Sequence, residues 1–135
     1  KDIIITAGGK NLTPANLEND LKQSRWISQA VMHGDRRPYP VALITLDPEE
    51  ITPWAQERGL PVEMAELVEH EEILELIQAV LDRANAKYAQ VEQIKKFALL
   101  DHDLTQEGGE LTPTLKLKRN VVNERYANVF EALYG

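Results

Sequence analysis

The spacing of hydrophobic positions along the chain changes several times, and each change marks a new element of secondary structure. Continuous apolar or β-branched runs bounded by Gly, Pro or Asp are typical of strands, whereas apolar residues three or four apart are typical of amphipathic helices. The clearest helical pattern covers residues 71–88, with an apolar stripe of Ile73, Leu76, Ile77, Val80, Leu81, Ala84 and Tyr88. The whole pattern predicts strands at 2–6, 27–34, 39–47 and 94–101, and helices at 12–24, 47–59, 61–70, 71–88 and 117–133.

Turn and capping residues support several of these boundaries. Gly8 and Gly9 permit positive φ and predict a turn at 7–10. Thr13 before a proline is typical of a helix N-cap, and Asp47 is expected to cap the helix at 47–59. Local chemistry and hydrophobic spacing therefore agree on where the first two helices begin.

The order of the elements predicts the fold class. The strands at 27–34 and 39–47 flank a short basic turn, "GDRRP", and are expected to form a β-hairpin. A polar loop is expected at 104–113. The last helix is expected to bury Val122, Tyr126, Val129, Phe130 and Leu133. Because strands and helices are mixed along the chain, we expect an α+β fold in which helices cover a small sheet that includes the hairpin.

Composition narrows the class of protein. The chain has 135 residues, the size of one domain that buries a core without disulfides. Its 15 basic and 22 acidic residues give a net charge of −7, which argues against nucleic acid as a partner. There is no cysteine, so a disulfide and a thiolate metal site are both excluded, and a reducing cytoplasm is a compatible location. No apolar stretch reaches the roughly 18 residues of a membrane span.

Histidine and carboxylate positions give no metal motif. His33, His70 and His102 are far apart, and neither HxxH nor HExxH occurs. "DHD" at 101–103 is interpreted as a strand-end turn in preference to a cation clamp, so no metal site is predicted. The glycine turn in "TAGGKN" also matches neither GxGxxG nor GxxxxGK[ST], the two common phosphate loops.

Basic residues are concentrated near the C-terminus of this acidic chain. Lys116, Lys118 and Arg119 fall within four positions, after a Gly-Gly turn and at the start of a predicted helix. Cations are unfavourable at a helix N-terminus, so the cluster indicates a purpose other than helix stability.

Two segments together resemble a known superfamily. "KDIIITAGGKNLTPANLE" (1–18) is similar to the hinge-and-loop motif of acyl-adenylate-forming enzymes, and "LTPTLKLKR" (111–119) resembles the C-terminal lysine motif as long-chain acyl-CoA synthetases carry it. Segments 32–47 and 124–134 also look like that branch. The resemblance spans the chain but covers only the C-terminal lid domain of such an enzyme. The chain opens without Met inside a predicted strand, and we expect that it was cut from a longer protein.

The resemblance implies a catalytic lysine. The common motif is Pro-x-Thr-x-x-Gly-Lys; here Thr112 stands four residues before Lys116, while Glu110 replaces the Pro and Leu115 the Gly. The catalytic assignment therefore goes to Lys116, with Lys118 as runner-up. In the family, this lysine serves the first step, in which a carboxylate attacks ATP to give acyl-AMP and pyrophosphate.

The resemblance also implies that a second surface of the domain serves the coenzyme A step. Lys1 and Asp2 stand at the hinge about which the C-terminal domain rotates, and Gly8, Gly9 and Lys10 form the loop that then lines the coenzyme A tunnel. The thiol of coenzyme A displaces AMP in that step. We expect ATP with Mg²⁺ and coenzyme A to be substrates of the full-length enzyme, and neither to be bound by this domain alone.

The alternatives to a CoA ligase concern the molecule that accepts the acyl group and whether the domain belongs to an enzyme. A fatty acyl-AMP ligase that passes the acyl group to a carrier protein would share both motifs, and a non-enzymatic binding module is a third option. The expected partners are the enzyme's own N-terminal domain, which is absent here, and fatty acid, ATP and coenzyme A. The acyl pocket belongs to that domain, so acyl length is left open. The expected location is cytoplasmic, with peripheral membrane contact through the lipid substrate left open.

Overall fold

The centre of the fold is a three-stranded sheet, seen here in a computed structural model that describes residues 2–135. Its strands are β3 (Ile27–His33), β4 (Val41–Leu46) and β5 (Lys96–Leu99), in that order. β3 and β4 pair antiparallel as the expected hairpin, and β5 pairs parallel to β4. A parallel pair needs a long crossover, and the three helices between β4 and β5 provide it.

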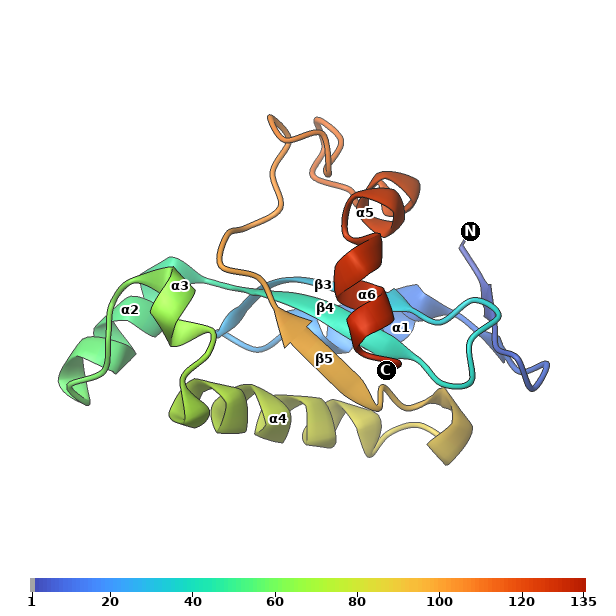
Figure 1. The fold of residues 1–135 in the computed structure, drawn as a ribbon, viewed down its shortest axis with the longest axis horizontal. Coiled ribbons are helices and arrows are strands. Elements are labelled where there is room, and N and C mark those ends of the chain that lie inside the picture. The colour runs from blue at the N-terminus through green and yellow to red at the C-terminus, as the bar shows by residue number, and fades with distance from the viewer. Residues whose placement is uncertain (1) are drawn as a thin grey trace.

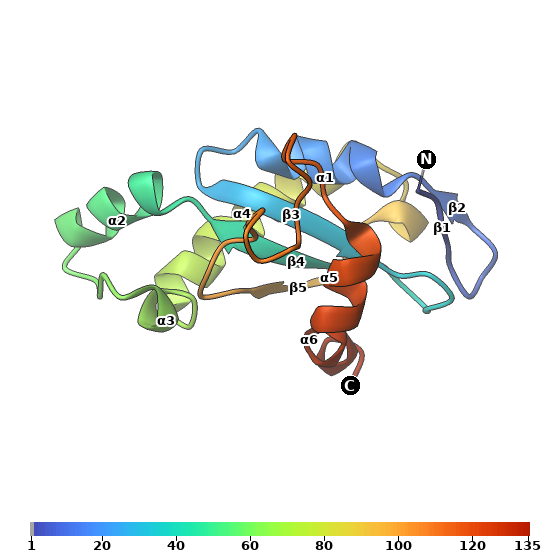
Figure 2. The same cartoon turned by 90° about the horizontal axis from the view of Figure 1, so that it is seen from above.

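Both faces of this sheet are covered by helices, as Figures 1 and 2 show. Side chains alternate along β4, so Ala42 and Ile44 belong to one hydrophobic cluster, and Val41 and Leu43 to another. The first cluster includes residues of α1 (Pro14–Lys22) and α4 (Glu71–Asn85), and the second includes residues of α5 (Arg119–Arg125) and α6 (Ala127–Ala132). Two cores on one sheet explain why all six residues of β4 are buried.

A second, smaller sheet extends from one end of the hairpin. β1 (Ile4–Ile5) and β2 (Asn11–Leu12) pair antiparallel around the predicted glycine turn. β1 is shorter than the predicted strand 2–6, and β2 had no strand prediction. The tip of the β3–β4 hairpin holds this small sheet, because Arg36 N–H donates to the Ile5 carbonyl at 2.7 Å and Ala7 N–H donates to the Arg37 carbonyl at 2.9 Å.

The helices of the first two thirds of the chain confirm their predictions with shorter boundaries. α2 (Pro48–Glu57) is capped by Asp47, whose side chain accepts from Glu49 N–H at 3.0 Å. Thr13 is the N-cap residue of α1, but its side chain makes no capping hydrogen bond. α3 (Met64–Leu67) is a single turn, and α4 buries most of the predicted stripe. A short 3-10 helix, η1 (Gln90–Glu92), leads to β5.

The C-terminal third differs from the prediction in two places. The helix expected at 117–133 begins at Arg119 and is divided at Tyr126 into α5 and α6. The loop expected to be polar at 104–113 contains three buried residues, Leu104, Glu110 and Leu111. The two segments are in contact, because the hydroxyl of Tyr126 at the break between the helices donates to the inward-turned carboxylate of Glu110. Within residues 2–135, no helix combines the length and the apolar character that crossing a membrane requires.

Candidate functional site

Lys116 lies on a tight hairpin that projects from the sheet, visible in orange in Figure 1. Leu111 and Leu117 form an isolated antiparallel bridge at its base. Above the bridge, Thr112 N–H donates to the Lys116 carbonyl at 2.7 Å, and Lys116 N–H donates to Thr112 Oγ1 at 3.0 Å. We call residues 111–117 the lysine hairpin. Its hydrogen bonds fix the backbone of Lys116, while the side chain is exposed and makes no ion pair within residues 2–135.

The residue before Lys116 shows why the family motif has glycine there. Leu115 has φ +63°, in the left-handed region, and its side chain is 65% exposed. Its N–H donates to the Thr112 carbonyl at 2.8 Å and closes the turn. A residue with Cβ is disfavoured in this conformation, so the hairpin keeps the glycine geometry with a leucine in place.

The backbone of Lys118, the runner-up for the catalytic lysine, has a structural role. It is the N-cap residue of α5, and its N–H donates to the Glu110 carbonyl at 2.8 Å. Its side chain is exposed, as that of Lys116 is. The geometry therefore leaves both lysines accessible, and the choice of Lys116 stays a prediction that rests on the motif.

Arg119 is engaged inside the domain. Its guanidinium binds the buried carboxylate of Glu18 with two hydrogen bonds, 2.7 and 2.8 Å long, and Nε donates to Asp2 Oδ2 at 2.9 Å. Burial alone lowers the pKa of Arg119, but Glu18 and Asp2 outweigh it and raise the pKa above its ordinary value. Glu18 also accepts from Met32 N–H at 2.6 Å. Arg119 thus joins the lysine segment to α1, to β3 and to the N-terminal segment that precedes β1.

The predicted hinge is described in part. Lys1 lies outside the described residues, whereas Asp2 is exposed and bound to Arg119. Asp2 therefore belongs to the body of the domain through this ion pair. The role of Lys1 and Asp2 as a hinge stays a prediction.

The glycine loop is a well-formed turn. Thr6 N–H donates to the Lys10 carbonyl at 3.0 Å, and Gly9 N–H donates to the Thr6 carbonyl at 2.9 Å. Gly9 has φ +86°, while Gly8 has no positive φ; a Cβ on either residue would meet no atom within 4 Å. The turn predicted from sequence is confirmed, and only Gly9 requires glycine for its backbone conformation.

A groove of about 450 Å³ lies beside this loop. Its lining residues are Thr6, Gly8, Lys10, Pro38, Tyr39, Gln90, Val91 and Lys95. Lys10 pairs with Glu92 at 3.4 Å, Lys95 Nζ donates to the Gln90 carbonyl, and Lys96 lies over the ring of Tyr39 at 5.9 Å. The groove is therefore lined by apolar groups, such as Pro38, Tyr39 and Val91, and by the cationic side chains of Lys10 and Lys95.

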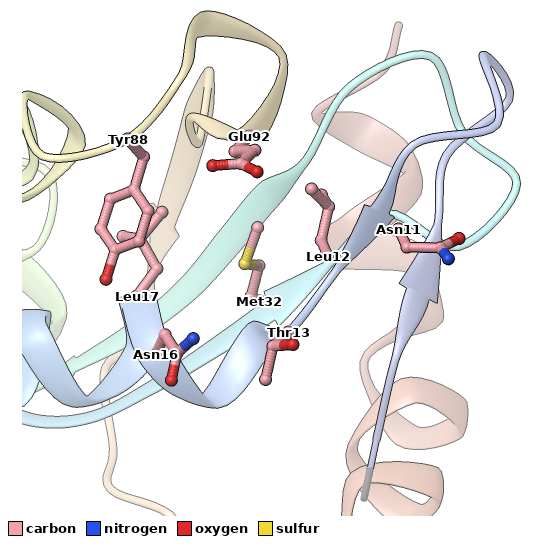
Figure 3. A pocket seen from close by; sticks show the side chains of 8 residues that line it. All are labelled: Asn11, Leu12, Thr13, Asn16, Leu17, Met32, Tyr88 and Glu92. Carbon is pink, nitrogen blue, oxygen red and sulfur yellow. The ribbon is translucent and has the colours of Figure 1, made fainter.

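A smaller cavity of about 140 Å³ lies between α1, β2 and the segment after α4 (Figure 3). Figure 3 shows Met32 near the middle of the cavity, with Tyr88 and Glu92 on one side and Asn16 and Thr13 on the other. This volume is below the roughly 300 Å³ of typical small-molecule pockets. The cavity is therefore too small to be the main ligand site of the domain.

The lysine hairpin and the glycine loop occupy separate parts of the molecule. In Figure 1 the hairpin is at the top and the loop, in dark blue, is at the far right. The two candidate segments therefore face different parts of the surface of the domain.

The histidines and nearby acids are occupied by hydrogen bonds. His102 contacts Asp101 at 2.8 Å and Tyr126 Oη at 3.0 Å, and Asp103 accepts from the hydroxyls of Ser28 and Thr45. Among residues 2–135, no group of three His, Asp or Glu side chains is arranged to hold a metal ion.

Sequence reasoning named Glu110 and Arg119 as motif residues but did not predict their partners. Glu110 is buried against Tyr126, and the half-buried Arg119 is bound to Glu18. For Arg119 a signal was available, because its partner Glu18 lies in the first quoted motif. Nothing local indicated that Glu110 would be buried.

Comparison with known proteins identifies the family. The family model described as AMP-binding enzyme C-terminal domain matches residues 1–135. Two curated relatives are long-chain-fatty-acid–CoA ligases. FadD15 of Mycobacterium tuberculosis is 43% identical over 100% of this chain and 23% of its own length, and heimdall of Drosophila melanogaster is 32% identical over 99% and 25%. The chain thus spans about a quarter of these relatives.

Solved structures show the same fold. The A-PCP didomain of carboxylic acid reductase from Segniliparus rugosus, in complex with AMP, matches with a TM-score of 0.77 and 22% identity, covering 99% of this chain and 17% of that one. A fatty acyl CoA synthetase of Mycobacterium tuberculosis matches with a TM-score of 0.57 and 18% identity, covering 95% and 20%. The expected α+β lid-domain fold is confirmed. Taken with the family model, which covers every residue, the comparisons show that the chain belongs to the C-terminal domain family of AMP-binding enzymes.

Proposed function

We propose that the chain is the mobile C-terminal domain of an ATP-dependent long-chain fatty acid–CoA ligase. The names of the curated relatives support this, as does the match over the whole chain. The full-length enzyme would first convert fatty acid and ATP to acyl-AMP and pyrophosphate. The thiol of coenzyme A would then attack the acyl carbon, and AMP would leave with the electron pair of the broken carbon–oxygen bond.

The observation that carries the proposal is the exposed ammonium of Lys116 on a backbone fixed by hydrogen bonds. The fatty-acid carboxylate and the α-phosphate of ATP are both anionic, and their approach is opposed by Coulomb repulsion. An ammonium placed between the two oxygens reduces this repulsion and aligns them. A compact charge on a long stem suits a visit to the active site of another domain.

The glycine loop and its groove support coenzyme A as the acceptor. A turn that lacks side chains at Gly8 and Gly9 leaves room for the thin pantetheine arm. The ammonium groups of Lys10 and Lys95 beside it suit the phosphates of the coenzyme A nucleotide. A carrier protein would bring its phosphopantetheine without that nucleotide, so the groove favours coenzyme A over a carrier protein.

The remaining parts of the proposal concern the partner domain and the setting. The N-terminal domain would hold ATP, its Mg²⁺ and the fatty acid, and residues 1 and 2 would be the pivot between the domains. We assign the full-length protein to the cytoplasm, with peripheral contact to membranes that contain its lipid substrate. Flotation of the full-length protein with lipid vesicles tests that contact.

The decisive experiment separates the two half-reactions in the full-length protein. Lys116→Ala should lower the rate of acyl-AMP formation by about a hundredfold or more, as for loss of one preorganised charge. Thioester formation from supplied acyl-AMP should continue. Lys118→Ala is the matched control, with near-normal rates in both steps. If Lys118→Ala shows the selective loss and Lys116→Ala does not, the assignment of the catalytic lysine is wrong.

A further inference from the structure

The residue at the base of the lysine hairpin carries a buried carboxylate, and we infer that this residue, Glu110, is a positioning residue for Lys116. The inference rests on the proposed role of Lys116 in acyl-AMP formation. It assigns to Glu110 a part in the first half-reaction alone, exerted through the backbone of the hairpin and without contact with substrate.

The contacts of Glu110 join both ends of the loop that carries the lysine. Its backbone N–H donates to the Thr105 carbonyl at 3.1 Å, and its own carbonyl accepts from Lys118 N–H at 2.8 Å. The side chain adds a third connection, because Oε1 accepts from Thr105 N–H at 3.1 Å. Residues 105 and 118 are thereby fixed to a single residue, and the lysine hairpin rises between them.

The far end of the carboxylate is anchored in the second core. Glu110 is only 4% exposed, and Oε2 accepts from the hydroxyl of Tyr126 and lies 3.3 Å from Arg125 Nη1. Tyr126 is buried beside Val122 and Phe130, on the helices that cover the sheet. Glu110 and Tyr126 therefore connect the base of the lysine hairpin to the core that covers the sheet.

The protonation states favour this anchor at neutral pH. Burial alone would raise the pKa of the Glu110 carboxyl, but hydrogen bonds from Tyr126, Thr105 N–H and Arg125 outweigh it and hold the pKa below its ordinary value. Burial and the hydrogen bond to Glu110 raise the pKa of Tyr126 to about 12. Tyr126 thus stays a neutral donor, and Glu110 stays an ionised acceptor.

The family motif offers a physical comparison. Glu110 stands where the common lysine motif has proline, which fixes φ through its ring. A glutamate has no such restraint in its backbone. In this chain the side-chain hydrogen bonds supply the restraint instead, and their loss would let Lys116 move. A displacement of about 1 Å at a positioned group is enough to cost up to a hundredfold in rate.

The test uses the full-length enzyme with Glu110→Gln, which keeps the size of the side chain and removes its charge. Acyl-AMP formation should fall by about tenfold to a hundredfold, with the KM for ATP little changed. Thioester formation from supplied acyl-AMP should stay within about twofold, because that step does not use Lys116. Glu107→Gln is the matched control, because Glu107 is exposed on the same loop and lacks these contacts. It should leave both rates unchanged.

A purely structural role predicts a different pattern. Equal losses in both half-reactions, or normal acyl-AMP formation by a folded Glu110→Gln enzyme, would overturn the inference. Tyr126→Phe removes only the hydroxyl and should give the same selective loss to a smaller degree, so it serves if Glu110→Gln does not fold.

A double variant separates this inference from the proposed function. If Glu110 acts through Lys116, then Glu110→Gln should cause no further loss of acyl-AMP formation in a Lys116→Ala enzyme. Additive losses would contradict the inference while leaving the proposed function intact. Normal acyl-AMP formation by Lys116→Ala alone would instead refute the proposed role of Lys116, on which this inference rests.

Discussion

The three clustered bases have three different surroundings at the scale of single residues. Lys116 projects from a hydrogen-bonded turn, Lys118 begins a helix, and Arg119 is bound between Glu18 and Asp2. The unfavourable position of a cation at a helix N-terminus is therefore offset for Arg119 by two carboxylates. The cluster combines a proposed catalytic charge with a structural one.

Leu115 allows a prediction about stability. Because its φ of +63° disfavours a residue with Cβ and its side chain is 65% exposed, Leu115→Gly should remove strain with little loss of burial. We expect the free energy of unfolding to rise by roughly 0.5 kcal/mol, since the greater freedom of glycine in the unfolded chain cancels part of the gain. Urea denaturation of the 135-residue chain measures this.

Leu74→Gly is the control for that measurement. Leu74 is also exposed, but it lies inside α4, where glycine should lower the free energy of unfolding by about 1 kcal/mol. A clear destabilisation by Leu115→Gly would mean that the leucine side chain contributes more than its exposure indicates.

Two neighbouring glycines differ at the scale of the element. The loop between β1 and β2 needs glycine at position 9 for its backbone, whereas position 8 has an ordinary φ and open space around it. Substitution at Gly9 would therefore mix backbone strain with any effect on a ligand. Gly8 is the cleaner position for testing the function of the loop.

Gly8→Leu should separate the two half-reactions in the opposite way to Lys116→Ala. The added side chain would occupy space that we assign to the pantetheine arm, so thioester formation should slow by about tenfold or more, the cost of a misplaced reactant. Acyl-AMP formation should be near normal, because the loop is remote from the lysine hairpin (Figure 1).

The thermal midpoint of Gly8→Leu must first be close to that of the wild type, and Gly9→Ala serves as the control for backbone strain. Unchanged thioester formation by Gly8→Leu would show that the loop does not border the path of coenzyme A. Equal slowing of both steps would indicate a structural role only.

At the scale of the whole molecule, the three-stranded sheet with two covered faces forms the centre, and the smaller β1–β2 sheet carries the glycine loop. Arg119 connects distant parts of the chain. It binds Asp2, which is 117 positions away in the sequence, and Glu18, which is 101 positions away. In the proposed mechanism the domain would rotate as a unit between the two reaction steps and would present segments at separate places in turn.

The proposed separation of sites between two domains predicts the ligase activity and ATP binding of this domain alone. We propose that the nucleotide site belongs to the N-terminal domain, so the 135-residue chain should show no ligase activity and negligible binding of ATP. Calorimetric titration with Mg-ATP should give no heat beyond dilution at concentrations of about 1 mM, where any site with a micromolar Kd would saturate. Tight binding would mean that the domain has a nucleotide site of its own.

Sequence reasoning predicted the features that depend on neighbouring residues. Short-range patterns predicted the stripe of α4, the β3–β4 hairpin, the Asp47 cap and the glycine turn. The motif resemblance added the family and the candidate lysine. These features were accessible because helical and strand periods, capping and turn geometry are properties of a few consecutive residues.

Only the tertiary structure decided where the buried charges go. Four features depend on partners that are distant in the sequence: the pairing of β2, the break at Tyr126, the burial of Glu110 and the ion pair between Arg119 and Glu18. Glutamate and arginine in a polar segment are ordinarily exposed, and burial becomes favourable only when a partner compensates for lost hydration. The sequence by itself thus determined the local elements. The folded chain determined where Glu110 and Arg119 place their charges, because a buried charge requires a partner that only folding brings near.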